Sequence, residues 1–228
     1  LLIQLNKQMS TWDPKSEISQ FNDWNSKVPF AVSDDFLKVV RKSITISEQT
    51  GGLFDPTVYD LMSLWGFGPN PKSGFPNLED VHRTLGHTGI SHFKTTDSEL
   101  SKRNEKCKLD LNAIAKGYGV DKIFNFLNEK GFNNIFVEIG GEVKCSGKNR
   151  ESKDWSIGIE NPSGDGNYQK KISAIISITN SAIATSGNYR NIVDLDGAFA
   201  GKPMNFEVIT EIVRALPTVS IQIGGGIR

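Results

Sequence analysis

The sequence predicts an α+β fold, in which helices and antiparallel strands occupy separate stretches of the chain. Residues 34–50 and 113–127 carry apolar side chains at the spacing of a helix that buries one face. Residues 155–159 and 172–178 alternate apolar with small or polar side chains, which is the period of half-buried antiparallel strands. A turn-rich loop at residues 161–166 separates these two strands, and this favours sequential pairing over a regular doubly wound sheet.

The first part of the chain is predicted to be mostly helical. Apolar spacing indicates a helix at residues 1–9, and we expect its beginning to lie before the first residue of this chain. Ser33 is predicted to cap the next helix, which the Gly51–Gly52 pair ends. The prolines and glycine at residues 69–76 predict a loop, and residues 77–85 fit a short helix.

The middle of the chain is predicted to combine one long helix with short extended segments. Residues 109–111 are expected to be extended, and the helix at 113–127 should end near Gly131. Residues 134–139 are predicted to form a strand that ends at the Gly140–Gly141 pair.

Composition excludes several classes of protein. Lys and Arg total 26 and Asp and Glu total 26, so there is no basic excess that would favour nucleic-acid binding. Cys107 and Cys145 are too few and too far apart for a disulfide framework or a CxxC pair, and we expect both to be structural. No run of residues approaches the length of apolar sequence that spans a membrane, and the chain does not open on a signal segment.

Four segments carry specific patterns, in which aromatic residues or glycines stand beside charged side chains. They are MSTWDPKSEISQFN at residues 9–22, GGLFDPTV and LWGFGP within residues 51–69, LDLNAIAKGYGVD at residues 109–121, and EIGGEVKCSG with ATSGNYR within residues 138–190. Together these segments resemble the FAD:protein FMN transferase (ApbE) family over about residues 1–192, with Trp12 where the family pattern has tyrosine. The resemblance implies an ApbE-like flavin transferase domain.

The residue types in these segments suit a flavin nucleotide. The ring of Trp12 could stack on a planar isoalloxazine or adenine, which stabilises such a pair by about 1 kcal/mol. Glycines such as Gly51 and Gly52 let the backbone approach a ligand closely. Asp110 lies just before a predicted helix whose first-turn N–H groups form an anion site for a diphosphate. Lys116 could add a charge-assisted contact.

The resemblance also implies individual roles. It implies that FAD is the substrate and that Mg²⁺ is required, with the backbone carbonyl of Ala113 as one metal ligand. It implies that Asn22 biases the site between transfer and hydrolysis of FAD. The residues that would hold FAD are Trp12, Asn22, Leu53, Phe54, Asp55, Asp110 and Lys116. The pattern assigns no catalytic residue.

Several of these residues also have a purely structural interpretation. Trp12 could be part of the core. Asp110 could be a helix N-cap and Lys116 a solvated surface charge. The Gly140–Gly141 pair could expose N–H groups to phosphate oxygens, or it could form a plain turn.

Residues 193–228 depart from the family pattern. They resemble a strand–helix–strand piece of the phosphoribosyl isomerase of histidine biosynthesis, a (β/α)8 barrel enzyme, and are far too short to close a barrel. We therefore expect a transferase domain at residues 1–192, incomplete at both ends, and an isomerase-like fragment at 193–228. The fragment is either a joined reading frame or a divergent natural tail. The family's remaining magnesium ligands and its base are expected to lie in the missing portion, which leaves the activity of this chain open.

The resemblance implies magnesium-dependent transfer of FMN from FAD to a threonine of an acceptor flavoprotein, with release of AMP. The alternatives are a magnesium-dependent FAD pyrophosphatase, which gives FMN and AMP, and a non-catalytic FAD-binding module. An isomerase of histidine biosynthesis is supported only by the tail. The family is usually exported, periplasmic or membrane-anchored, which makes a membrane tether in the full-length protein one possibility. The balanced charge predicts no nucleic-acid partner.

Overall fold

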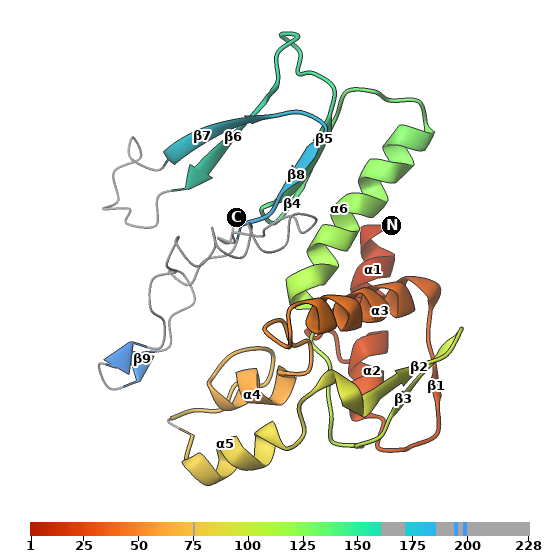
Figure 1. The fold of residues 1–228 in the computed structure, drawn as a ribbon, viewed down its shortest axis with the longest axis vertical. Helices are drawn as coiled ribbons and strands as arrows, with labels where there is room; N and C mark the ends of the chain where they lie inside the picture. The colour runs from red at the N-terminus through yellow and green to blue at the C-terminus, as the bar shows by residue number, and fades with distance from the viewer. Residues whose placement is uncertain (75, 161–171, 186–193, 196–197, 200–228) are drawn as a thin grey trace. The chain divides into compact units, whose positions relative to one another are not determined.

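The computed structural model describes residues 1–74, 76–160, 172–185, 194–195 and 198–199, and it divides into two compact units. Unit 1 comprises Leu1–Tyr118 and unit 2 comprises Gly119–Arg228. Figure 1 shows the elements of both units, and each unit is described by itself.

Unit 1 begins with helices, as the apolar spacing of its sequence predicts. They are α1 (Leu2–Met9), α2 (Glu17–Asp23), α3 (Asp34–Gln49), α4 (Tyr59–Leu64) and α5 (Leu78–Leu85). The predicted helices at the positions of α1, α3 and α5 are confirmed. The short helices α2 and α4 were not predicted, because fewer than eight residues give too little apolar periodicity to detect.

The side chains that begin these helices differ from one helix to the next. The Ser16 hydroxyl accepts the Ser19 N–H at 3.1 Å and so caps α2. Ser33 is the N-cap residue of α3, as predicted, but its side chain makes no capping bond. Instead the Glu17 carboxylate accepts the Ser33 N–H at 2.5 Å and the Ser33 hydroxyl at 2.7 Å. This carboxylate therefore joins the first turn of α2 to the start of α3.

A small antiparallel sheet completes unit 1. Its strands are β1 (Phe30–Ala31), β2 (Phe93–Thr95) and β3 (Glu99–Lys102), in the order β1-β3-β2. A 3-10 turn at Ile90–His92 leads into β2. Strands this short were not visible in the sequence, since two to four residues cannot establish an alternation.

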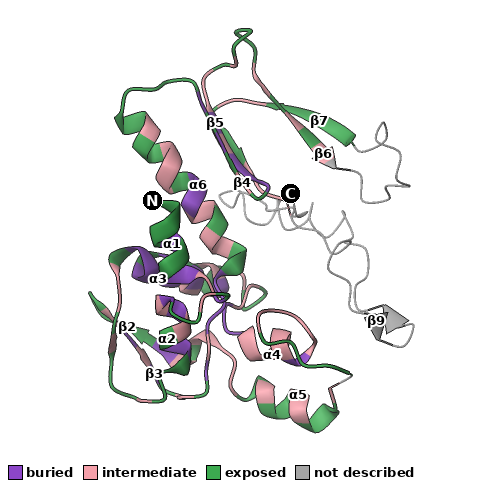
Figure 2. Cartoon of the chain, turned by 180° about the vertical axis from the view of Figure 1, so that it is seen from behind, coloured by how far each residue is buried: buried purple, intermediate pink, exposed green. Residues whose placement is uncertain are grey.

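The core of unit 1 lies where its first three helices and this sheet meet, and Figure 2 shows the buried residues concentrated there. Phe21 is fully buried, and its ring packs edge-on against Phe30 at 5.8 Å and Phe36 at 6.4 Å between ring centres. Cys107 is a buried free thiol in the same cluster, consistent with the structural role predicted for it.

A long helix, α6 (Asn112–Glu129), begins in unit 1 and ends in unit 2. The helix ends close to Gly131 as predicted. Gly131 has a φ of +87°, and the Phe132 N–H donates to the Leu127 carbonyl at 3.2 Å. In unit 2, Val120 of this helix packs with Ile135 and Val137 in a second apolar cluster.

The main sheet of unit 2 is antiparallel, in the order β4-β5-β8. Its strands are β4 (Ile135–Ile139), β5 (Glu142–Ser146) and β8 (Ser181–Ile183). Gly140 and Gly141 connect β4 to β5 with φ values of +57° and +101°, which only glycine adopts easily at both positions of a hairpin turn.

The strands β6 (Trp155–Glu160) and β7 (Ile172–Ile178) pair antiparallel, which confirms the sequential pairing predicted from their alternation. The half-buried character predicted for them is wrong for β7, where Ile172 is 57% exposed and Ile175 is 70% exposed. The physical reason is that, among the described residues, β6 and β7 pair only with each other, and a two-stranded sheet buries little apolar surface.

The predicted tail is mostly outside the described residues. Within it the structure describes only β9 (Asp194–Leu195) and β10 (Ala198–Phe199), which pair antiparallel, so the strand–helix–strand prediction for residues 193–228 is not addressed. Among the described residues, no helix has the length and apolar character needed to cross a membrane.

Candidate functional site

Three of the four sequence segments meet in unit 1 at residues 109–112, the connection that enters α6. The Asp110 N–H donates to the Pro56 carbonyl at 2.8 Å, which attaches the glycine-rich segment at 51–57. The Asn112 amide donates to the Thr11 hydroxyl at 3.2 Å, which attaches the residues after α1. These contacts bring together segments that are distant in the sequence.

Asp110 is at the centre of this arrangement and is only 8% exposed. Its Oδ1 accepts the Asn112 N–H at 2.7 Å and its Oδ2 accepts the Asn112 side-chain amide at 3.1 Å. Burial raises the pKa of this carboxyl, and the two hydrogen bonds from Asn112 oppose that shift. These contacts close a turn from Asp110 onto Asn112, the first residue of α6, whereas the first helical N–H groups donate to the Leu111 carbonyl, so Asp110 is not the N-cap residue of the helix. A carboxylate has further lone pairs, so this turn does not prevent ligand binding.

The segment at 51–57 is a tight turn that its own side chains hold in place. The Asp55 carboxylate accepts the N–H and the hydroxyl of Thr57 at 2.8 and 2.5 Å. The Thr57 hydroxyl in turn accepts the Gly89 N–H at 2.6 Å. The Phe54 N–H donates to the Thr50 hydroxyl at 3.2 Å, and Leu53 is left 85% exposed. Asp55 thus shapes the turn, while Leu53 offers an apolar surface.

Trp12 is 67% exposed, so its interpretation as a core residue is wrong. It follows directly on Thr11, whose hydroxyl is bonded to Asn112 at the start of α6. The residue next to Trp12 is therefore attached to the start of α6, and the Trp12 side chain remains accessible to a ligand.

Asn22 lies behind the connection and is only 4% exposed. Its side-chain amide donates to the Leu109 carbonyl and accepts the Leu109 N–H, each at 2.8 Å. The Asn22 side chain thus bonds both backbone groups of Leu109, as the backbone of a neighbouring strand would. Asn22 therefore holds the residue before Asp110 in place, and its own amide group is engaged in this contact.

Lys116 and Ala113 lie in the first turns of α6, and both are exposed. The carbonyl of a residue at this position accepts a hydrogen bond within the helix and keeps a second lone pair. Among the described residues, no group of three His, Cys, Asp or Glu side chains could hold a metal ion.

The fourth segment belongs to unit 2, and its glycines form a turn. The Gly141 N–H donates to the Glu138 carboxylate at 3.1 Å, so this amide is already engaged. The plain-turn interpretation of the Gly140–Gly141 pair is the one that these contacts support. Most of the ATSGNYR segment, residues 186–190, lies outside the described residues.

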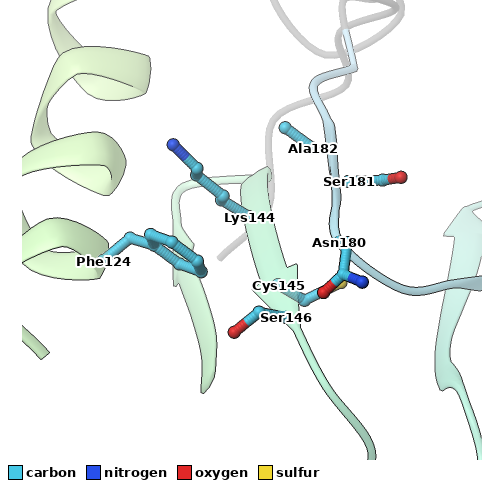
Figure 3. Close-up of a pocket in the computed structure, with 7 residues that line it drawn as sticks. All are labelled: Phe124, Lys144, Cys145, Ser146, Asn180, Ser181 and Ala182. Carbon is cyan, nitrogen blue, oxygen red and sulfur yellow. The ribbon is translucent and has the colours of Figure 1, made fainter. Parts of the chain in front are cut away.

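Unit 2 also contains an open hollow of about 530 Å³, and none of the predicted site residues lines it. Figure 3 shows Lys144 of β5 and Phe124 of α6 at its edge. Asp121 holds the Lys144 ammonium at 2.6 Å, and this ammonium lies 4.7 Å from the centre of the Phe124 ring. The lysine is thus engaged within the fold, and the hollow is a weaker candidate than the residues around Asp110.

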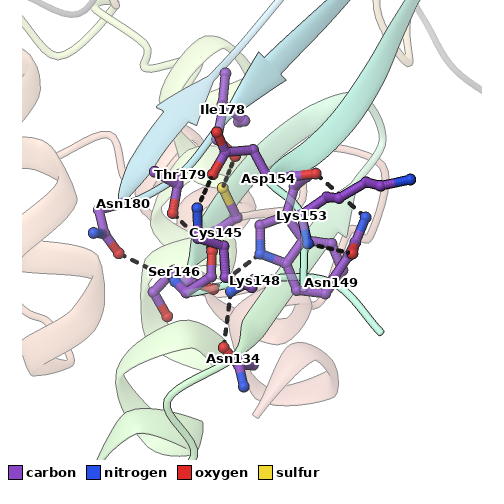
Figure 4. A network of polar contacts seen from close by, with 12 residues as sticks. Asn134, Cys145, Ser146, Lys148, Asn149, Lys153, Asp154, Ile178, Thr179 and Asn180 are labelled. Atoms are coloured by element: carbon purple, nitrogen blue, oxygen red, sulfur yellow. Dashed lines mark hydrogen bonds and ion pairs between the residues drawn. The ribbon is translucent and has the colours of Figure 1, made fainter. Parts of the chain in front are cut away.

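The polar groups after β5 stabilise a turn, as Figure 4 shows. The Lys148 N–H donates to the Asn134 side chain at 2.8 Å. The Gly147 N–H donates to the Asn180 side chain at 3.1 Å, and the Thr179 hydroxyl donates to the Gly147 carbonyl at 2.7 Å. A Cβ on Gly147 would lie 2.2 Å from the Asn134 side chain, at a φ of +64°. The last glycine of the EIGGEVKCSG segment is therefore required by packing.

Comparison with known proteins identifies the family of this chain. The sequence profile of the ApbE family matches residues 1–205. The chain belongs to the ApbE family. The match extends past residue 192, where the resemblance was predicted to end, and the α+β fold is that of an ApbE-like flavin transferase.

Two relatives of this ApbE-family chain carry the name FAD:protein FMN transferase. The Vibrio cholerae protein is 40% identical over 222 residues, which cover 93% of this chain and 66% of that protein. The Haemophilus influenzae protein is 37% identical over 204 residues, which cover 86% of this chain and 58% of that protein. The chain thus spans less than two thirds of the length of either relative.

Solved structures show the same fold. The flavin transferase ApbE from Vibrio cholerae aligns with a TM-score of 0.76 and 42% identity, over 83% of this chain and 61% of that one. The ApbE protein from Thermotoga maritima aligns with a TM-score of 0.75 and 29% identity, over 86% of this chain and 62% of that one.

The sequence did not identify several residues that build the site. Thr57 could have been found, since an Asp two residues before a Thr is the spacing of a side-chain-stabilised turn. Thr11 and Asn112 could not, because their contact joins residues 101 positions apart. Nor could Lys102, whose ammonium donates to the Asn22 carbonyl at 2.9 Å from 80 positions away.

Proposed function

We propose that this chain binds FAD at the Asp110 connection and belongs to an enzyme that transfers FMN from FAD to a threonine of an acceptor flavoprotein, releasing AMP. The observation that carries the proposal is the convergence of three family segments on residues 109–112. The two relatives named FAD:protein FMN transferase support the reaction.

The apolar and positively charged groups in the segments that meet at Asp110 suit a flavin nucleotide. Trp12 and Leu53 are exposed apolar side chains, and each belongs to a segment that is hydrogen-bonded to the Asp110 connection. Such surfaces would bury the planar ring of a flavin or adenine. The start of α6 and Lys116 supply partial and full positive charge, which suits the diphosphate.

In FAD, one bridging oxygen joins the phosphorus of FMN to that of AMP. Transfer of FMN breaks the bond between this oxygen and the FMN phosphorus, so that AMP leaves, and forms a phosphoester bond to the threonine oxygen. The contribution of this chain is positioning, since the reacting groups must be held in line. The turn fixed by Asp55 and Thr57 and the connection fixed by Asn22 keep the FAD-binding residues rigid. Mg²⁺, when bound, would neutralise charge on the diphosphate, and the Ala113 carbonyl is the donor proposed for it here.

Hydrolysis of FAD to FMN and AMP is the second candidate, and it uses the same residues with water as acceptor. The position of Asn22 bears on this choice. Because its amide pairs with Leu109, Asn22 would influence the outcome by fixing Asp110 rather than by touching the flavin.

The test is incubation of the chain with FAD, Mg²⁺ and a protein that carries a target threonine. AMP together with a covalently flavinylated acceptor supports transfer. AMP with free FMN supports hydrolysis, and bound intact FAD supports a binding module. An absence of FAD binding in a folded chain would contradict all three.

Two further proposals concern the natural context of the chain. We propose an exported or membrane-tethered protein, which fractionation of the source cells would test. We also propose that residues 193–228 derive from an isomerase-like reading frame. The family match, which extends through residue 205, is an observation against this proposal. Sequencing the source DNA across codons 185–200 in one contiguous piece decides this, and an unbroken natural frame would exclude the join.

A further inference from the structure

Lys102, the last residue of β3, is buried in the core of unit 1 with only 2% of its surface exposed. Its ammonium donates to the Asn22 carbonyl at 2.9 Å and to the Glu105 carbonyl at 3.5 Å. It also lies 4.8 Å from the centre of the Phe21 ring. In the part of the chain that the structure describes, its partners at these distances are carbonyl groups and a ring, with no carboxylate at ion-pair distance.

The contact with Asn22 leads directly to the candidate site. Asn22 lies in the last turn of α2, where a helix leaves carbonyl groups without donors of its own. The lysine supplies such a donor, and its positive charge suits a helix C-terminus. The Asn22 side chain then pairs with both backbone groups of Leu109, the residue before Asp110. Each step of this path is a direct hydrogen bond or a peptide bond.

We propose that Lys102 is a positioning residue for FAD binding, whose ammonium group holds the end of α2 so that the Asn22 amide fixes Leu109 and, through it, Asp110. The inference rests on the proposed FAD site. Stability alone does not account for the lysine, because burying an ammonium costs free energy that an apolar side chain of similar length would not.

The charges that face Lys102 come from several elements. Burial, together with a smaller effect of the nearby Lys108, lowers the pKa of Lys102 to about 8, and this value already includes the opposing effects of Cys107, Asp23 and Asp60. The ammonium form therefore predominates at neutral pH and is lost at mildly alkaline pH. An ammonium donates a stronger hydrogen bond to a carbonyl than a neutral amine does. The hold on Asn22 should weaken as the proton leaves.

The decisive variant is Lys102→Met, which keeps the length of the side chain and removes the donor. Lys106→Met is the matched control, because Lys106 is exposed. By equilibrium dialysis at neutral pH, we expect Lys102→Met to weaken FAD binding about three- to tenfold, the effect of one lost hydrogen bond. Lys106→Met should bind as the unmodified chain does. The melting temperature of Lys102→Met should stay within about 4 °C, since relief from charge burial and loss of the Asn22 contact oppose each other.

A pH profile separates positioning from a general structural role. Between about pH 7 and pH 9, FAD binding by the unmodified chain should weaken about two- to threefold as Lys102 loses its proton, while Lys102→Met should show no such step. Identical profiles, or unchanged affinity in Lys102→Met, would overturn the inference. If Lys102→Met does not fold, the profile of the unmodified chain decides, and a flat profile overturns it.

Failure of this inference can be told apart from failure of the proposed function. The FAD site itself is contradicted if the folded, unmodified chain does not bind FAD. It is also contradicted if the Asp110→Ala variant binds FAD as tightly as the unmodified chain. Binding that depends on Asp110 but not on Lys102 contradicts only the positioning role.

Discussion

At the scale of single residues, Asp110 forms a turn with Asn112 and is proposed to contribute to FAD binding, and two substitutions can separate these roles. Asp110→Ala removes the acceptor for both Asn112 groups and the carboxylate itself, whereas Asp110→Asn keeps an acceptor for the Asn112 N–H. We expect Asp110→Ala to weaken FAD binding by about 1–3 kcal/mol, the cost of leaving such groups unpaired. Isothermal titration calorimetry with FAD measures this.

The control for Asp110 is Asp97→Ala, since Asp97 is fully exposed and its pairing with Arg41 is long, at 3.8 Å. It should bind FAD normally. If Asp110→Asn binds FAD as tightly as the unmodified chain, the hydrogen bond from the Asn112 N–H accounts for the role of Asp110, and its charge does not. If Asp110→Ala binds FAD as tightly as the unmodified chain, this residue does not belong to the site.

The exposed ring of Trp12 gives a second prediction at this scale. Trp12→Ala should weaken FAD binding by about 1 kcal/mol or more, and Trp12→Tyr should retain most of the affinity, because both rings stack. The melting temperature should not change, since Trp12 is 67% exposed. Ile3→Ala, which shortens another exposed apolar side chain, is the control for both measurements. Equal loss in the Ala and Tyr variants would show that stacking is not the role of Trp12.

At the scale of elements, the Glu17 carboxylate is the contact that joins α2 to α3. Glu17→Ala leaves the Ser33 N–H and hydroxyl without their acceptor, and we expect a loss of about 1.5–3 kcal/mol in the free energy of unfolding. Urea denaturation measures the change, and Glu48→Ala on the exposed side of α3 is the control. A Glu17→Ala variant as stable as its control would mean that these two bonds contribute nothing net.

The sequence predicted long elements well and short ones poorly. Helices α3 and α6 could be predicted because each has many apolar residues at helical spacing. The turn after β4 could be predicted because its glycine pair adopts positive φ values. The short α2 and the strands of unit 1 owe their existence to packing around Phe21, which is a tertiary effect.

The candidate site shows the same limit. Motif residues such as Trp12 and Asp110 could be located from the sequence, but the buried position of Asn22 could not. An asparagine that pairs with a distant backbone looks, in sequence, the same as one that faces a ligand.

At the scale of the whole molecule, the buried titratable groups of unit 1 predict how stability depends on pH. A lysine with a lowered pKa binds fewer protons folded than unfolded between its folded value of about 8 and its ordinary value of 10.5. Its contribution to stability therefore rises with pH across this window. Burial raises the pKa of Cys107 from 9.0 to about 12, and its contribution falls as pH rises between those values.

Of these two groups, only Lys102 changes the stability with pH below 9.0, the ordinary pKa of the Cys107 thiol. The free energy of unfolding should therefore rise between about pH 8 and pH 9, and above pH 9 the thiol should oppose this rise. Urea midpoints measured at closely spaced pH values would show this rise. Lys102→Met should remove it, whereas Lys106→Met should leave it intact. A rise that persists in Lys102→Met would assign the titration to another group.

The exposure of Trp12 to solvent also means that its intrinsic fluorescence can report on FAD binding. An indole in contact with water emits at longer wavelength than one that is covered, and Trp12 is the most exposed of the large aromatic residues in the described part of the chain. A flavin stacked on this ring would shield it from solvent and accept its excitation energy, so occupancy of the site should appear as a quenched and blue-shifted emission. Because Trp24 donates its indole N–H to the Val28 carbonyl and packs on Phe30, its emission should respond less. Binding can thus be followed in real time without any label on the protein or the nucleotide.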